Sequence, residues 1–202
     1  MSEMEFEKFG KIGRLNRDVT ITEKVDGTNA QLLFDAFGRM MVGSRTREIW
    51  PEGTEGKEKG CDNAAFAKWA YENQQDLFEF LGEGRHYGEW AGAKIQRKYG
   101  MDHRVFALFN THLFGEAGES EIPENLVDIG LTSVPVLYEG LFTTDTVDRV
   151  MRHLKETGSQ FAPFFMNPEG IVIYHHGAKV YFKQTFEHDN TGKGKNRQTG
   201  EG

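Results

Sequence analysis

The sequence predicts an α+β protein built mainly of antiparallel β-sheet. Short β-like runs recur along the 202 residues, and most of the 24 glycines lie between them. Only two long segments have the apolar spacing that is typical of an amphipathic helix. Because strands and helices do not alternate regularly, the pattern favours α+β over a parallel α/β sheet.

The strand candidates are short apolar runs bounded by glycine or charged residues. Two pairs of neighbouring runs meet at tight-turn signals, Phe37-Gly38 and His176-Gly177, and we expect each pair to form a hairpin. The eight candidates are Val19–Val25, Ala30–Asp35, Arg39–Ser44, Arg85–Trp90, Arg104–Phe109, Val134–Tyr138, Gly170–Tyr174 and Lys179–Gln184.

Three segments are predicted to be helices. Asn63–Leu81 carries apolar residues close to one helical face and is followed by Gly82 as a stop signal. Asp145–Thr157 has the same kind of pattern and is followed by Gly158. A shorter helix is expected over Pro123–Ile129.

The composition is that of an ordinary soluble globular protein, with 38% hydrophobic and 27% charged residues. No apolar stretch approaches the ~18 residues of a membrane span, and the acidic N-terminus lacks the apolar run of a secretory signal. The lone Cys61 excludes an internal disulfide and a multi-cysteine zinc site. We therefore expect a cytoplasmic protein with no membrane partner.

One domain is expected over residues 1–187, followed by a flexible basic tail over residues 188–202 and no separate C-terminal domain. The net charge of −7 argues against a protein that binds nucleic acid over its whole surface, but it is compatible with a local basic groove. Nothing in the sequence indicates an oligomer, so we expect a monomer.

Polar residues interrupt or end several of the predicted strands. In ITEKVDGTNAQL, residues 21–32, charged side chains break a run that alternation would otherwise continue. Taken alone, this segment also fits a surface strand that enters an Asp-Gly turn. The later segments are VGSRT with Arg45, YGEWAG with Glu89, RVFALF with Phe106, PEGIVI with Glu169 and KVYFKQ with Lys183.

The order and spacing of these segments resemble the covalent nucleotidyltransferase superfamily of ATP-dependent DNA and RNA ligases and mRNA capping guanylyltransferases. The resemblance covers residues 20–185. EKVDGTN and YGEWAG look most like the RNA ligase branch, which includes phage and trypanosome RNA-editing ligases. The resemblance implies a nucleotidyltransferase (ATP-grasp-like) domain of mainly antiparallel β-sheets with flanking helices, and it is compatible with a phage-encoded protein that acts in the host cytoplasm.

The resemblance also implies a reaction. Lys24 would take AMP from ATP as lysyl-AMP, AMP would pass to a 5′-phosphate end, and a 3′-hydroxyl would then displace it. The expected partners are ATP and nucleic acid, with RNA favoured, and the expected cofactor is Mg²⁺ or Mn²⁺. A free lysine amine, with a pKa of about 10.4, is protonated at neutral pH, so neighbouring cations or burial must favour its neutral form.

The resemblance also implies roles for the motif residues. Glu89 matches the glutamate that holds the ribose, Phe106 the aromatic that stacks on adenine, and Glu169 a carboxylate that acts through a metal. Lys24, Lys183 and Glu169 are the expected catalytic residues, and Glu169 and Asp26, the latter through water, are the expected metal ligands. The expected nucleotide-binding residues are Glu23, Lys24, Asn29, Arg45, Glu89, Phe106, Glu169 and Lys183.

A basic cluster follows Glu89 in the segment AKIQRKYG. It fits either a solvated loop or a contact to the phosphate backbone. The expected nucleic-acid-binding residues are Arg45, Lys94, Arg97 and Lys98.

One departure from the family pattern concerns the final K-x-K motif. Thr185 stands where the second lysine is usual, two residues after Lys183. We expect slow or weak adenylation from this loss, unless Lys193 or Lys195 in the tail replaces the charge. The alternatives are a DNA ligase, a capping enzyme that takes GTP, or a protein that binds nucleotides or nucleic-acid ends with impaired chemistry.

Overall fold

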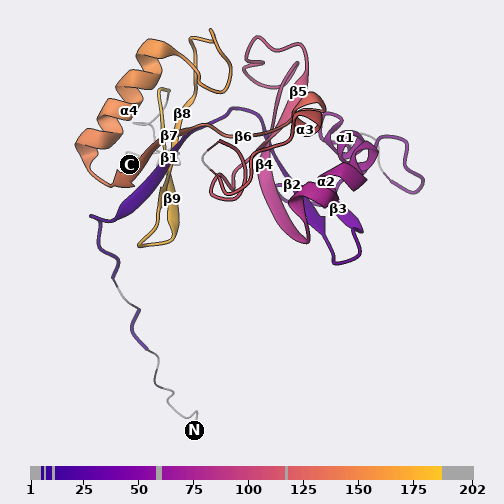
Figure 1. Cartoon of the computed structure of the whole chain (residues 1–202), viewed down its shortest axis with the longest axis horizontal. Coiled ribbons are helices and arrows are strands. Elements are labelled where there is room, and N and C mark those ends of the chain that lie inside the picture. The colour runs from indigo at the N-terminus through magenta and orange to yellow at the C-terminus, as the bar shows by residue number, and fades with distance from the viewer. Residues whose placement is uncertain (1–5, 7, 11, 58–60, 117, 188–202) are drawn as a thin grey trace, which may run out of the picture.

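The computed structural model describes residues 6, 8–10, 12–57, 61–116 and 118–187, and it confirms the predicted α+β class. Two separate β-sheets carry their helices on opposite outer sides, so that the faces turned away from these helices point towards each other (Figure 1). The predicted tail, residues 188–202, lies outside the described residues.

The first sheet, sheet A, has four antiparallel strands in the order β7-β1-β8-β9. Helix α4 (Thr144–Thr157) covers one face of it and is capped by Thr143, whose hydroxyl accepts a hydrogen bond from the backbone N–H of Thr146. Alternate apolar residues of β1 and β8 pack against α4. The strands are β1 (Asp18–Glu23), β7 (Val136–Leu141), β8 (Gly170–His175) and β9 (Val180–Thr185).

The second sheet, sheet B, has five strands in the order β3-β2-β4-β5-β6, and all its pairs are antiparallel except β5 with β6. Its outer face packs against α1 (Phe66–Glu72) and α2 (Gln74–Leu81), and α3 (Glu124–Asp128) contributes Leu126 to the same core. The strands are β2 (Thr28–Phe34), β3 (Met40–Ser44), β4 (Gly84–Gly92), β5 (Arg104–Leu108) and β6 (Leu131–Ser133).

The chain crosses between the two sheets at two short segments. Residues 24–27 join β1 to β2, and residues 134–135 join β6 to β7. The crossings lie against each other, because the backbone N–H of Glu23 donates to the carbonyl of Pro135 at 2.9 Å. The sequence segment with the most charged motif residues therefore lies at the junction of the sheets.

The helix predicted over Asn63–Leu81 is divided in the structure. Asn63, Ala64 and Ala65 have left-handed φ angles of 51°, 55° and 60°, so α1 begins only at Phe66. The carbonyl of Ala64 is held out of a helix because it accepts hydrogen bonds from the side chains of Trp90 and Arg104. Asn73, with φ −115°, then separates α1 from α2.

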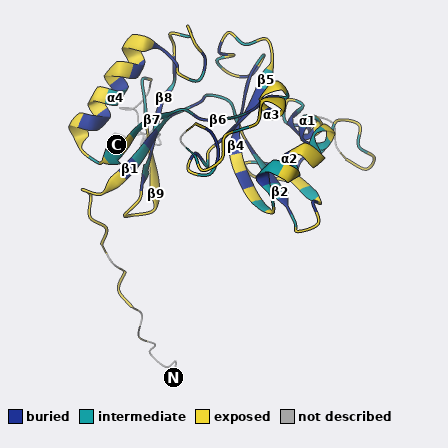
Figure 2. Cartoon of the chain, viewed as in Figure 1, coloured by how far each residue is buried: buried dark blue, intermediate teal, exposed yellow. Residues whose placement is uncertain are grey.

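Burial follows the two-sheet arrangement. Buried residues line the surfaces between each sheet and its helices, while the outward faces of the helices and the tips of the hairpins are exposed (Figure 2). Strand β6, which sequence analysis did not predict, has only three residues, and Leu131 is buried in the core of sheet B. Across the described ranges, no helix is long and apolar enough to cross a membrane.

Candidate active site

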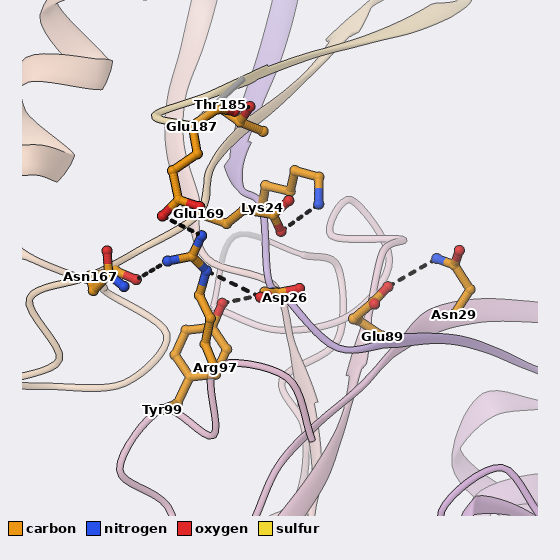
Figure 3. Close-up of polar contacts among 10 residues, drawn as sticks. All are labelled: Lys24, Asp26, Asn29, Glu89, Arg97, Tyr99, Asn167, Glu169, Thr185 and Glu187. Atoms are coloured by element: carbon orange, nitrogen blue, oxygen red, sulfur yellow. Dashed lines mark hydrogen bonds and ion pairs between the residues drawn. The ribbon is translucent and has the colours of Figure 1, made fainter. Parts of the chain in front are cut away.

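Lys24 lies directly after β1, and its side chain forms an ion pair with Glu169. The Nζ of Lys24 is 2.5 Å from Oε2 of Glu169, and both side chains are about one-fifth exposed (Figure 3). Glu169 immediately precedes β8, and the backbone N–H of Lys24 donates to the carbonyl of Gly170 at 2.9 Å. The pairing of β1 with β8 thus brings together two residues that are 145 positions apart in the sequence.

Asn29 and Glu89 face this ion pair from sheet B. They are register partners on β2 and β4, and the Nδ2 of Asn29 donates to Oε2 of Glu89 at 2.9 Å (Figure 3). Burial raises the pKa of Glu89 to about 7, against the lowering effects of the Lys24 charge and a hydrogen bond from the backbone of Gly27. The nearby carboxylates of Glu169 and Asp26 also raise it.

Gly27 is required by the close approach of two chain segments. A Cβ at this position would lie 2.9 Å from the Cγ of Glu89 and would also overlap the backbone of Trp90. Any larger residue would therefore push the Lys24 segment away from Glu89. This close contact is the physical reason for glycine in the K-x-D-G pattern.

Arg97 joins segments from both sheets rather than facing solvent. Its side chain is 14% exposed, and its Nε lies 3.1 Å from Oδ2 of Asp26, without hydrogen-bond geometry. Its terminal nitrogens donate to the carbonyl of Asn167 and to the carboxylate of Glu187, each at 3.2 Å (Figure 3). The guanidinium of Arg97 is therefore bound to internal partners in this structure, which differs from the expected exposed position of a residue that contacts nucleic acid.

Tyr99 completes this connection from the same loop. Its side chain is buried against Phe161 and Phe165, and its hydroxyl accepts a hydrogen bond from the backbone N–H of Asp26 at 2.7 Å. Burial raises the pKa of Tyr99, so the hydroxyl stays neutral. The carboxylate of Asp26 is paired with Arg97, which departs from its expected role in holding metal-bound water.

Glu23 points away from the ion pair, into the protein. Its carboxylate is 1% exposed and accepts hydrogen bonds from the Ser159 hydroxyl and from the backbone N–H groups of Gln160 and Phe161, at 2.6, 2.7 and 3.0 Å. Burial raises the pKa of Glu23, although these hydrogen bonds oppose the shift. The carboxylate of Glu23 therefore organises the loop between α4 and β8, and its backbone N–H is bound to the carbonyl of Pro135. The structure thus does not turn the Glu23 side chain towards the expected nucleotide site.

Phe106 does not face the region of Lys24, so its expected stacking on adenine is contradicted. Its ring is fully buried in the core of sheet B, with centroids 5.0 Å from Phe66 and 5.8 Å from Trp69. The residues on the other face of β5 include Ala107, which is the register partner of Glu89. Phe109 shares that face by alternation, and it is 42% exposed.

The other predicted cations come from both sheets and from the loop between β4 and β5. Arg45 follows β3, whose Ser44 pairs with Ala30, and it lines a hollow of about 260 Å³ together with Arg47 and Arg85. Lys183 is exposed on β9 and pairs with Val172 of β8. Lys94 and Lys98 are both exposed, in the loop that carries Arg97.

Thr185 pairs with Gly170, the residue whose carbonyl binds the backbone of Lys24. By alternation it lies on the same face of β9 as Lys183, which agrees with the expected direction of the K-x-K position. Its hydroxyl donates to the carbonyl of Glu187 at 2.6 Å. The tail lysines, Lys193 and Lys195, lie outside the described residues.

A divalent cation fits this site only together with a phosphate ligand. Within the described ranges, no three His, Cys, Asp or Glu side chains form a metal-binding group. The carboxylates of Glu89 and Glu169 nevertheless lie close enough to interact through their charges. Mg²⁺ is commonly held by one or two carboxylates and substrate phosphates, which is the donor set that these residues offer beside a nucleotide.

The RNA ligase family model matches residues 17–192. The chain belongs to the RNA ligase family. This match runs from the start of β1 past the end of β9, so it includes both sheets and every predicted site residue up to Lys183. No curated protein sequence is significantly similar to the chain.

The family fold is also found among solved structures. A Naegleria gruberi RNA ligase variant with AMP and Mn superposes with a TM-score of 0.56 at 18% identity, covering 85% of this chain and 50% of that one. A second variant of the same ligase, with ATP and Mn, has a TM-score of 0.55 at 19% identity and covers 85% of this chain and 50% of that one. The ligase with PPi has a TM-score of 0.54 at 18% identity and covers 84% of this chain and 49% of that one. The chain thus spans about half the length of these relatives.

Proposed function

We propose that the chain is an ATP-dependent RNA ligase whose covalent nucleophile is Lys24. The observation that carries the proposal is the Lys24–Glu169 ion pair, held opposite the Asn29–Glu89 pair in a chain of the RNA ligase family. The related Naegleria ligase structures contain ATP, AMP or PPi, which are the nucleotide reactant and the products of adenylation, and two of them also contain Mn.

In the first step, the Nζ of Lys24 attacks the α-phosphorus of ATP. A nitrogen–phosphorus bond forms, the bond to the β-phosphate oxygen breaks, and pyrophosphate leaves. The carboxylate of Glu169, at 2.5 Å, holds the ammonium until nucleotide arrives, and the ammonium then releases a proton to the surrounding water to give the neutral amine that attacks. Mg²⁺ or Mn²⁺, bound with ATP between Glu169 and Glu89, would neutralise charge on the phosphates.

The nucleotide would be recognised mainly by sheet B. Glu89 accepts a hydrogen bond from a ribose hydroxyl, and Asn29 fixes the orientation of Glu89. Phe109, rather than Phe106, stacks on adenine, because it shares the face of Glu89 and is partly exposed. Arg45 and Lys183 contact the phosphates from the two sheets.

In the later steps, an oxygen of the RNA 5′-phosphate attacks the lysyl-AMP phosphorus and Lys24 leaves as an amine. The 3′-hydroxyl of the second end then attacks the 5′-phosphorus, so that a phosphodiester forms and AMP leaves. Lys94 and Lys98, both exposed, provide phosphate contacts for the polynucleotide.

Label transfer tests this proposal directly. Incubation with ATP labelled at the α-phosphate and Mg²⁺ should place label on the chain, and Lys24→Ala should abolish it. Lys24→Arg should do the same, because a guanidinium stays protonated. Lys68→Ala is the matched control, because Lys68 is exposed on α1 and, within the part of the chain that the structure describes, its side chain forms an ion pair with Glu72 alone, at 3.7 Å.

Two other outcomes would redirect the assignment. Label from GTP in place of ATP would indicate a capping type, and no label from either would favour a binding protein. Label on Lys24→Ala would overturn the choice of nucleophile. Sealing of nicked duplexes and single strands, with RNA or DNA on each side of the joint, then separates an RNA ligase from a DNA ligase.

A further inference from the structure

Three aromatic rings form a row on the uncovered face of sheet A. Tyr174 of β8 and Tyr181 of β9 are register partners, with ring centroids 4.7 Å apart and planes 35° apart. The ring of His176 lies 4.9 Å from Tyr174, at 65°. Its Nε2 lies 2.9 Å from the hydroxyl of Thr20, which also holds this ring in place. We name these three residues the aromatic row.

The aromatic row lies on the same face of sheet A as the K-x-K position. Side chains alternate along β9, so Tyr181 shares a face with Lys183 and Thr185, while Phe182 points to the α4 side. Tyr174 is four residues from Gly170, which binds the backbone of Lys24. Four residues of strand span about 13 Å, close to four stacked nucleotides at roughly 3.4 Å per phosphate.

Packing does not account for the row. Tyr181 is 70% exposed, and none of the three residues belongs to a hydrophobic core of the described structure. A flat, exposed set of rings beside a lysine has the chemistry of a base-stacking platform, on which bases lie against aromatic faces and a cation contacts the backbone. Stacking needs no large positive field, which suits a chain with a net charge of −7.

We propose that the aromatic row binds unpaired bases of the RNA strand next to the joint, with Lys183 on the adjacent phosphate. This inference rests on the proposed ligase function and names its substrate class: an end with several single-stranded nucleotides. The row continues the face that carries Lys24, so a strand whose end reaches the lysine passes along it.

Fluorescence anisotropy with a labelled 5′-phosphorylated oligouridylate tests the proposal on the full chain. Tyr181→Ala should weaken binding by roughly 5-fold or more, the equivalent of one lost base–aromatic stack of about 1 kcal/mol, and Tyr181→Phe should retain it. Tyr174→Ala should behave like Tyr181→Ala. Phe182→Ala is the matched control, because Phe182 is 53% exposed on the same strand but on the opposite face.

A blunt duplex of the same length distinguishes base stacking from simple charge attraction. The Tyr181→Ala loss should be absent with this duplex, because its bases are already stacked. If Tyr181→Ala bound oligouridylate as tightly as the unaltered chain, the proposed role of the aromatic row would be wrong. It would also be wrong if Phe182→Ala lost as much affinity as Tyr181→Ala. Label transfer from ATP to the unaltered chain is measured in parallel: absence of label there would count against the ligase proposal itself, independently of the row.

Discussion

Sheets A and B contribute to the same site but are built differently. In sheet B, Asn29 and Glu89 lie on neighbouring inner strands, which an aromatic core of Phe66, Trp90 and Phe106 supports from behind. In sheet A, Lys183 lies on β9, an edge strand whose residues 180–183 are all exposed. Under the proposed function, the difference corresponds to a fixed surface for the nucleotide on sheet B and a more adaptable one for phosphates and polynucleotide on sheet A.

The largest expected effect tests whether sheet B is the rigid side. Phe106→Ala should lower the free energy of unfolding by about 3–5 kcal/mol, because it empties a fully buried ring site. Urea denaturation measures this loss. The matched change in sheet A, Phe182→Ala, should cost less than about 1 kcal/mol, because that ring is 53% exposed.

Phe109→Ala completes this comparison, because it removes a ring from the opposite face of sheet B. It should leave stability almost unchanged while weakening ATP binding, as measured by calorimetry. Similar stability losses in Phe106→Ala and Phe182→Ala would remove the distinction between the two sheets.

The next effect concerns the junction of the sheets. Glu23→Ala should cost about 3 kcal/mol, because it leaves the Ser159 hydroxyl and two backbone N–H groups without their acceptor. Ser159→Ala, which removes a single one of these bonds, should cost about 1 kcal/mol. Thermal or urea unfolding measures both, and a Glu23→Ala variant as stable as the unaltered chain would show that the loop holds itself in place.

A smaller effect should appear as a pH dependence of sheet B. The pKa of Glu89 is raised from 4.5 to about 7 in the folded chain, so its protonated form stabilises the fold below pH 4.5 and this contribution is lost as the pH rises through about 7. The free energy of unfolding should therefore fall between pH 5 and pH 8. Glu89→Gln should flatten this part of the profile, and an unchanged slope would assign the titration elsewhere.

The smallest expected effect lies on sheet A. Thr185→Lys restores a cation beside Gly170 and should raise the adenylation rate, or lower the Mg²⁺ requirement, by up to about 10-fold. Single-turnover labelling across a Mg²⁺ titration measures it. If Thr185→Lys left the adenylation rate unchanged or lowered it, while Lys183→Ala lowered it severely, another cation would already fill this role.

The sequence predicted every strand except β6, because alternation is a local pattern, and the resemblance placed Lys24 and Glu169 in one site. The pairing of β1 with β8 that brings these two residues into contact was not predicted, because it joins segments that are distant in the sequence. The sequence also did not predict which face Phe106 occupies. RVFALF offers aromatic residues on both faces, and only the pairing of Glu89 with Ala107 decides between them. The role of Arg97 was missed for a related reason, since its loop turns through left-handed residues whose partners are distant in sequence.

Two chain segments connect the sheets, and Lys24 lies in the first of them, residues 24–27. The second, residues 134–135, is hydrogen-bonded to the neighbouring Glu23. A change in the angle between the sheets must be absorbed by the backbone dihedrals of these few residues, as at a domain hinge. Lys24, the proposed nucleophile, would therefore move with any such change. If sheets A and B moved apart and together, the amine of Lys24 would change its direction between one substrate and the next, and no separate moving lid would be needed.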